Sequence, residues 1–330
     1  MGIGSNAGGS VGRLVSHWIP LSILLGMPAL SRASDAKAFQ ARSHKMGADK
    51  SLVYRLFVPK NYQAAKKYPL MLTLHGAGER GINNTSQLLH DFNNMWADDT
   101  IQNPNPCFVV APQCPADSQW VNTPWANGSY SLDKVAISEP MKTVVAILDS
   151  LGREFNIDAD RIYVSGISMG GFGTWFMAMK YPDRFAAAVP VCGGADPKKA
   201  PLVSKLPIWT FHAEDDGVVP VAGTREMVAA LKTAGSSVKY TEYPKALGYN
   251  HQSWVPAGKT PELWRWVFSQ ARVTVAVKAP GPGPAGPTGP TGRASAVEAD
   301  KAIKADRTDA LGKIQSEGAS RVPGFPLPLP

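Results

Sequence analysis

The chain has 330 residues, of which 44 % are hydrophobic, and a formal net charge of +8 at pH 7. This length and composition allow one large α/β domain or two small ones. The basic residues are scattered rather than interleaved with aromatic side chains, so the positive charge does not predict a nucleic-acid partner.

Residues 1–33 have the pattern of a secretory signal peptide. Arg13 precedes the apolar run "WIPLSILLGMPAL", and the small residues Ser31 and Ala33 stand where a signal peptidase reads the chain. We predict cleavage after Ala33 and a secreted or periplasmic mature protein. A stable membrane span is the weaker interpretation, because the run is short for a bilayer and contains two prolines.

Residues 45–272 alternate between apolar runs and helical segments. This pattern predicts a single α/β domain with a mainly parallel central sheet and helices on both faces. The expected strands are residues 51–62, 68–76, 107–113, 161–166, 185–193, 206–213 and 237–244. The expected helices are residues 138–155, 169–180, 224–235 and 261–272. Ser138 is the predicted N-cap of the first helix, and Gly235 is the residue expected just after the third.

The composition changes after residue 272. Residues 273–294 include "GPAGPTGPTGRA", which is four Gly-X-Y triplets. A collagen triple helix needs a much longer repeat, so we predict an extended, collagen-like Pro/Gly linker. Residues 295–330 are charged and poor in aromatic side chains, which is typical of a disordered tail.

The three cysteines, Cys107, Cys114 and Cys192, cannot all pair with one another. Cys107 and Cys114 flank a predicted strand, which would separate them by roughly 23 Å, beyond the reach of a disulfide. We therefore predict free and mostly buried thiols without a catalytic signature.

The stretch "RIYVSGISMGGFGTW", residues 161–175, joins a predicted strand to a predicted helix at Gly166-x-Ser168-x-Gly170. This is the pattern of the nucleophile elbow of α/β-hydrolases, a turn so sharp that the residues two positions from the serine must lack bulk. Ser168 is therefore the candidate nucleophile, and the backbone N–H of Met169 can face a developing oxyanion. Ser165 is a weaker alternative, because it lies on the strand side without flanking glycines.

A serine nucleophile needs a base, and the base needs an acid to orient it. In α/β-hydrolases the acid and then the histidine follow the serine along the chain, each in a loop at the carboxyl end of a strand. His251, in "GYNHQSW", has the required position and is the predicted base. The chain order alone leaves the acid open among the adjacent Glu214, Asp215 and Asp216. We expect structural roles for His75, His90 and His212.

From about residue 52 to residue 272 the chain resembles the bacterial phospholipase/carboxylesterase and "predicted peptidase" branch of the α/β-hydrolases, near feruloyl esterases and polyhydroxybutyrate depolymerases. That branch has a histidine, usually a glycine, two variable residues, the catalytic Asp, one variable residue and Val-Val-Pro. "HAEDDGVVP" matches this pattern with Ala213 in place of the glycine. The resemblance implies that Asp216 is the acid, with Asp215 as the alternative. It also implies that the backbone N–H of Ala77, in "LHGAGERG", completes the oxyanion hole.

Trp120 and Trp125 follow the strand expected over residues 107–113 and should lie near the top of the sheet, and Trp254 comes three residues after His251. All three are candidate contacts for an aryl or sugar group of a substrate. Packing of a loop onto the domain is the competing explanation for each of them. The spacing of His, Cys and Asp predicts no metal site, and acyl transfer by serine needs no cofactor.

These patterns predict a secreted serine carboxylesterase that hydrolyses short-chain or aryl (feruloyl-type) esters through Ser168, Asp216 and His251 and an acyl-enzyme. The expected partner is a small-molecule or polymer-linked ester. The alternatives among enzymes are a serine peptidase of the prolyl-oligopeptidase type and a polyester depolymerase. A non-catalytic binding module on a hydrolase fold is the alternative from a different class.

Overall fold

The computed structural model describes residues 36–272. The predicted signal peptide, the Pro/Gly linker and the tail lie outside the described residues.

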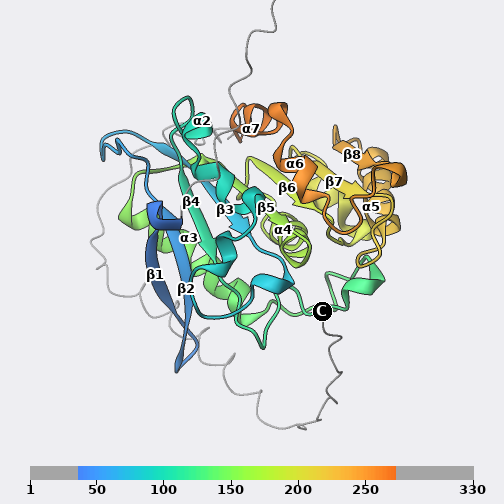
Figure 1. Cartoon of the computed structure of the whole chain (residues 1–330), viewed down its shortest axis with the longest axis horizontal. Helices are drawn as coiled ribbons and strands as arrows, with labels where there is room; N and C mark the ends of the chain where they lie inside the picture. Colours follow the sequence, from blue (N-terminus) through green and yellow to red (C-terminus); the bar gives the residue numbers. More distant parts are fainter. Residues whose placement is uncertain (1–35, 273–330) are drawn as a thin grey trace, which may run out of the picture. The chain divides into compact units, whose positions relative to one another are not determined.

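Eight strands form one sheet in the order β1-β2-β4-β3-β5-β6-β7-β8 (Figure 1). The strands are β1 (Gln40–Met46), β2 (Lys50–Phe57), β3 (Tyr68–Leu74), β4 (Phe108–Pro112), β5 (Ile157–Ile167), β6 (Ala187–Val191), β7 (Trp209–Ala213) and β8 (Lys239–Tyr243). The pairs β1–β2 and β2–β4 are antiparallel, and every other pair is parallel. The mainly parallel sheet predicted from the apolar runs is therefore confirmed.

Helices cover both faces of this sheet. They are α1 (Asp91–Asn94), α2 (Asp99–Gln102), α3 (Glu139–Glu154), α4 (Met169–Lys180), α5 (Val221–Thr233), α6 (Trp254–Gly258) and α7 (Pro261–Phe268). On β3, Leu72 packs with Trp175 and the rest of the α3, α4 and α5 core, whereas the adjacent Met71 packs with Leu263 and the α1, α6 and α7 core. Alternate residues of a strand point to opposite faces, so one apolar run serves two cores.

The sheet begins before the domain start that the sequence predicts at residue 45. β1 has the composition of an exposed edge strand, because only Met46 of its seven residues is buried. Backbone pairing with β2 holds it in the sheet, from Gln40 opposite Leu56 to Met46 opposite Lys50. Hydrophobic periodicity does not reveal such a strand. The strand expected over residues 51–62 ends at Phe57, shortly before Pro59, which has no N–H for a sheet.

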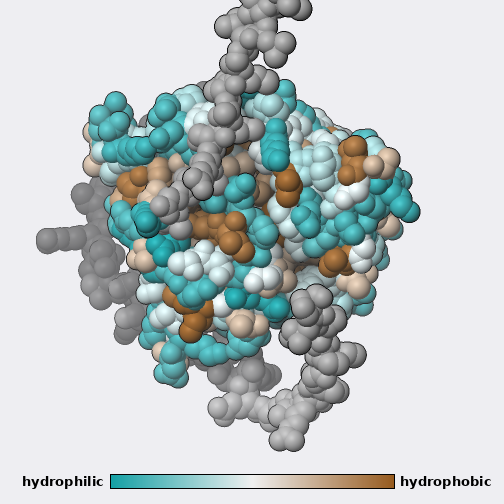
Figure 2. Space-filling model, viewed as in Figure 1, coloured by the Kyte–Doolittle hydropathy of each residue, from teal (hydrophilic) through white to brown (hydrophobic). Residues whose placement is uncertain are grey.

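Local signals define the long helices well. The Oγ of Ser138 accepts a hydrogen bond from the N–H of Met141, at 3.2 Å, and caps α3 as predicted. Gly235 has a φ of +77° just after α5, as expected of a residue that ends a helix. Within residues 36–272, none of the helices combines the length and the apolar character needed to cross a membrane. In Figure 2, hydrophobic residues form small separate patches among hydrophilic ones on the visible face.

Candidate active site

Ser168 is the turn residue between β5 and α4. Its φ of 53° and ψ of −119° lie in a region that side-chain-bearing residues rarely adopt. A Cβ atom on Gly170 would lie 2.1 Å from the backbone oxygen of Leu74, and one on Gly166 would lie 2.4 Å from that of Gly170. The glycines on either side of the serine therefore meet the steric demand of a tight elbow.

Gly170→Ala is expected to destabilise the fold by about 3 kcal/mol or more, because backbone atoms of β3 leave no room for a methyl group. Gly152→Ala, in the exposed part of α3, meets no atom within 4 Å and is the matched control. This control is expected to stabilise the fold by about 0.5–1 kcal/mol. Urea unfolding of both variants measures the difference, and equal stability of the two variants would contradict the steric explanation.

The structure brings Ser168, His251 and Asp216 together. The Oγ of Ser168 is 2.8 Å from Nε2 of His251. The Nδ1 of the same ring is 2.8 Å from Oδ2 and 3.0 Å from Oδ1 of Asp216. Asp216 lies in the loop after β7 and His251 in the loop after β8, so both reach the serine from the carboxyl edge of a parallel sheet.

The Asp216 carboxylate is fully buried and strongly anchored. Its Oδ1 accepts the N–H groups of Val218 and Val219, each at 2.9 Å. Burial acts to raise the pKa of Asp216, but hydrogen bonds from His212 and His251 outweigh it, so the pKa lies well below its usual range. The carboxylate therefore stays ionised beside the imidazole.

The two neighbouring acids have other partners. Oδ1 of Asp215 accepts the N–H of Asn250 at 3.0 Å. The Glu214 carboxylate accepts the N–H of Lys245 at 3.0 Å and lies 3.5 Å from the Arg225 guanidinium. Of the three acids that the sequence leaves open, Asp216 is the one bonded to His251.

The two residues predicted to form the oxyanion hole, Met169 and Ala77, lie on segments that border the serine. Met169 is the first residue of α4, so its N–H has no acceptor within the helix. Ala77 begins a short 3₁₀ helix, Ala77–Glu79, directly after Gly76. A Cβ on Gly76 would lie only 3.6 Å from Cβ of Ser168, so this loop passes close to the elbow. The carbonyl of Ala77 accepts a hydrogen bond from Nε of Arg80 at 2.9 Å, which holds the loop.

The side chain of His75 hydrogen-bonds to the backbone of the same loop. Its Nε2 accepts the N–H of Cys114 at 2.9 Å, so Nδ1 carries the proton and donates to the carbonyl of Gly76 at 2.6 Å. Burial lowers the pKa of His75 to about 4, which keeps the ring neutral. The structural role expected for this histidine agrees with these contacts.

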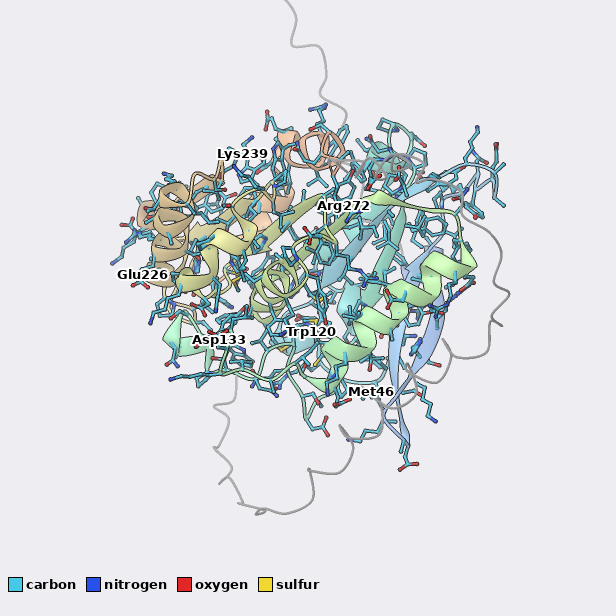
Figure 3. All side chains as sticks on the ribbon, turned by 180° about the vertical axis from the view of Figure 1, so that it is seen from behind. Met46, Trp120, Asp133, Glu226, Lys239 and Arg272 are labelled. Atoms are coloured by element: carbon cyan, nitrogen blue, oxygen red, sulfur yellow. The ribbon has the colours of Figure 1, made fainter. Side chains whose placement is uncertain are left out.

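The prediction that Trp120 contacts substrate is wrong. Its side chain is fully buried and its Nε1 donates to the carbonyl of His75 at 3.1 Å. It lies inside the domain near α4, where its Cβ is 3.0 Å from a Cβ built on Gly173 (Figure 3). A large indole placed over the sheet fills the core, and its N–H satisfies a loop carbonyl.

The other two tryptophans are half-buried near the site. The guanidinium of Arg80 lies over the ring of Trp125, 5.7 Å from its centroid. Trp254 meets the His251 ring edge-on, with 5.5 Å between centroids, and also packs on His90 at 5.2 Å. Trp254 therefore packs directly on the ring that contacts Ser168.

Cys192 is a neighbour of the site that the sequence did not single out. Its backbone has a φ of 39° just after β6, and its sulfur lies with ligand atoms of Asp216 and His251 inside a 4.8 Å group. Such a group has the donor types of a metal site. Burial raises the pKa of the thiol, however, and the Nδ1 proton of His251 already faces Asp216. These protonation states suit a hydrogen-bonded Asp–His pair better than a metal centre.

The thiols of Cys107, Cys114 and Cys192 are free and buried, as predicted. Burial raises the pKa of Cys107 and Cys114 to about 12, and raises that of Cys192 as well. The thiolate is the reactive form, so we expect no reaction of the folded protein with a disulfide reagent at pH 8 and reaction of all three thiols after unfolding.

The raised pKa values of the cysteines also decide how the stability of the fold depends on pH. Because the folded pKa values lie above the unfolded value of about 8.5, the free energy of unfolding should decline as the pH rises above that value. Thiol titration in buffer and in denaturant measures the reactivity, and fast labelling of the folded protein would contradict the burial.

Comparison with known proteins places the chain among esterases. The family profile described as "Putative esterase" matches residues 43–226. The crystal structure of a thermostable esterase is 41 % identical, with a TM-score of 0.66 over 72 % of this chain and 64 % of that chain.

Two curated relatives are more distant. A bifunctional acetylxylan esterase/xylanase of Neocallimastix patriciarum is 26 % identical over 56 % of this chain and 24 % of the relative. A poly(3-hydroxyoctanoate) depolymerase of Pseudomonas fluorescens is 31 % identical over 34 % of this chain and 42 % of the relative. The chain thus spans less than half the length of either relative. The family profile covers more than half of this chain and the sheet has the α/β-hydrolase arrangement, so the chain belongs to this esterase family.

Proposed function

We propose that the protein is a secreted serine carboxylesterase in which Ser168 is the nucleophile, His251 the base and Asp216 the acid that orients it. The observation that carries the proposal is the continuous series of hydrogen bonds from Ser168 Oγ through both ring nitrogens of His251 to Asp216. The N-terminal signal-peptide pattern supports secretion.

The contacts of His251 define its protonation state before reaction. Nδ1 contacts both oxygens of the Asp216 carboxylate, which are acceptors, so Nδ1 carries the ring proton and Nε2 is left to accept the hydroxyl proton of Ser168. The ionised Asp216 then stabilises the imidazolium that forms when the serine attacks.

The reaction proceeds in two acyl-transfer steps. Ser168 Oγ attacks the ester carbonyl while its proton moves to Nε2 of His251, and the N–H groups of Met169 and Ala77 stabilise the oxyanion. The imidazolium returns the proton to the departing alcohol, which leaves an acyl-enzyme. Water, deprotonated by the same Nε2, attacks the acyl carbonyl. As the second tetrahedral intermediate collapses, the bond between the acyl carbon and Oγ of Ser168 breaks, the imidazolium returns its proton to Oγ, and the acid leaves.

Short-chain or aryl esters, including feruloyl esters, are the proposed substrates, with Trp125 and Trp254 as the aromatic contacts. A polyester is the second candidate, because the chain resembles a poly(3-hydroxyoctanoate) depolymerase over 121 residues.

A fluorophosphonate probe and a matched substrate panel test the proposal. We expect the probe to label Ser168 and the protein to hydrolyse an ester much faster than the amide with the same acyl group. Equal turnover of ester and amide would favour a peptidase, and a folded protein that the probe does not label would favour a binding module. Short p-nitrophenyl esters, methyl ferulate and a polyester film then rank the substrates.

A further inference from the structure

His212 is a fully buried histidine near the end of β7, four residues before Asp216. Its Nε2 is 3.2 Å from Oδ2 of Asp216 and 3.0 Å from the backbone oxygen of Val219. Both of these atoms are acceptors, so Nε2 carries a hydrogen, with the carbonyl of Val219 as the nearer acceptor and Oδ2 of Asp216 as the second. The ring thus connects the rigid strand to the loop that bears the acid.

Thr224 selects this tautomer of His212. The Thr224 hydroxyl is 2.7 Å from Nδ1 of His212 and 3.3 Å from the carbonyl of Gly193. The hydroxyl has one hydrogen, and the shorter contact is the one to Nδ1, which can accept it. When Thr224 donates to Nδ1, the ring hydrogen is on Nε2, on the side of Asp216.

Both oxygens of the Asp216 carboxylate therefore have several hydrogen-bonding neighbours. Its Oδ2 lies between His251 Nδ1, at 2.8 Å, and His212 Nε2, at 3.2 Å. Its Oδ1 accepts the N–H groups of Val218 and Val219. Nδ1 of His251 also lies 3.0 Å from Oδ1, so backbone groups and His251 act on one oxygen, while His251 and His212 flank the other.

We propose that His212 is a positioning residue, which orients the Asp216 carboxylate so that this acid can hold His251 in the reactive tautomer and direction. The inference rests on the proposed function and deepens it. His212 donates its hydrogen bond from a sheet strand, whereas Asp216 and His251 are both in loops. A side chain on the strand can keep the geometry of two loop residues to the precision that proton transfer requires.

The first test compares variants that lose or keep the donor. In His212→Leu no donor faces Asp216, and kcat per titrated active site should fall by about tenfold to 100-fold with little change in KM. In His212→Gln the side-chain amide can place an N–H near the position of Nε2, and most of the activity should return. Thr210→Val is the matched control, because Thr210 is buried on the same strand and face but donates to Pro190. This control should change stability without changing kcat.

The second test separates positioning from a general structural role. In an Asp216→Asn background, His212→Leu should cause no further loss beyond about twofold, because effects that act through one residue are not additive. If His212→Leu does not fold, Thr224→Val can replace it in both backgrounds, because it keeps the side-chain volume but removes the hydroxyl that contacts His212. It should lower kcat with Asp216 present and not in the Asn background.

Two results would overturn the inference. One is a kcat of His212→Leu within about twofold of the wild type, and the other is an equal loss in both backgrounds. If Ser168→Ala loses turnover but His212→Leu keeps it, the positioning role alone is refuted. Turnover that persists in Ser168→Ala would refute the proposed function itself.

Discussion

Ser168→Ala is expected to lower ester turnover by about 10⁴-fold or more, because the variant has no nucleophilic oxygen to form the acyl-enzyme. The remaining Cβ occupies the same strained position at a φ of 53°, so the fold should keep its stability within about 1 kcal/mol. Hydrolysis of p-nitrophenyl butyrate measures the activity, and thermal unfolding measures the stability.

Ser165→Ala is the matched control for this prediction. Ser165 lies three residues before Ser168 and is fully buried in β5, and its hydroxyl has no hydrogen-bond partner within the described part of the chain. Its removal should leave turnover and stability nearly unchanged. Full activity of Ser168→Ala, or loss of activity only in Ser165→Ala, would show that the nucleophile has been assigned to the wrong residue.

Asp216→Asn is expected to lower kcat by about 10³- to 10⁴-fold. The amide group of asparagine can donate to Nδ1 of His251, which would move the ring proton to Nε2 and leave that nitrogen unable to accept the proton of Ser168. Steady-state kinetics with the same ester measure the loss.

Asp215→Asn is the matched control for Asp216→Asn, because it makes the same change in the adjacent acid. Oδ1 of Asp215 accepts the N–H of Asn250, and an amide oxygen can accept the same bond. We expect kcat within about twofold of the unmodified protein. A larger loss for Asp215→Asn than for Asp216→Asn would reverse the assignment of the acid.

The elbow could be predicted from the sequence because its determinants are local. Gly166, Ser168 and Gly170 lie within five consecutive residues, and the steric conflict that demands glycine arises from a turn between a strand and a helix. The helix expected over residues 169–180 is the observed α4, and the Ser138 cap is also local. Long apolar runs likewise identified the central parallel strands.

The placement of isolated side chains could not be predicted in this way. Trp120 follows a strand that ends at the top of the sheet, but its indole turns into the core to reach the carbonyl of His75, 45 residues away in sequence. β1 joins the sheet through backbone pairing, which leaves little hydrophobic pattern. In both cases the deciding contact is with a distant part of the chain.

The α/β architecture, the serine at the turn and the chain order of the candidate acid and base could all be predicted from the amino-acid sequence, because they depend on periodicity and local sterics. The family resemblance already pointed to Asp216 as the acid, and the structure shows its carboxylate bonded to His251 across 35 residues of chain. The position of His212 beside that carboxylate came from the structure and not from the sequence. Which of two adjacent side chains points inward depends on how the loop closes after β7. The contact between His212 and Asp216 likewise depends on how this loop closes in three dimensions, and hydrophobic periodicity does not encode that closure.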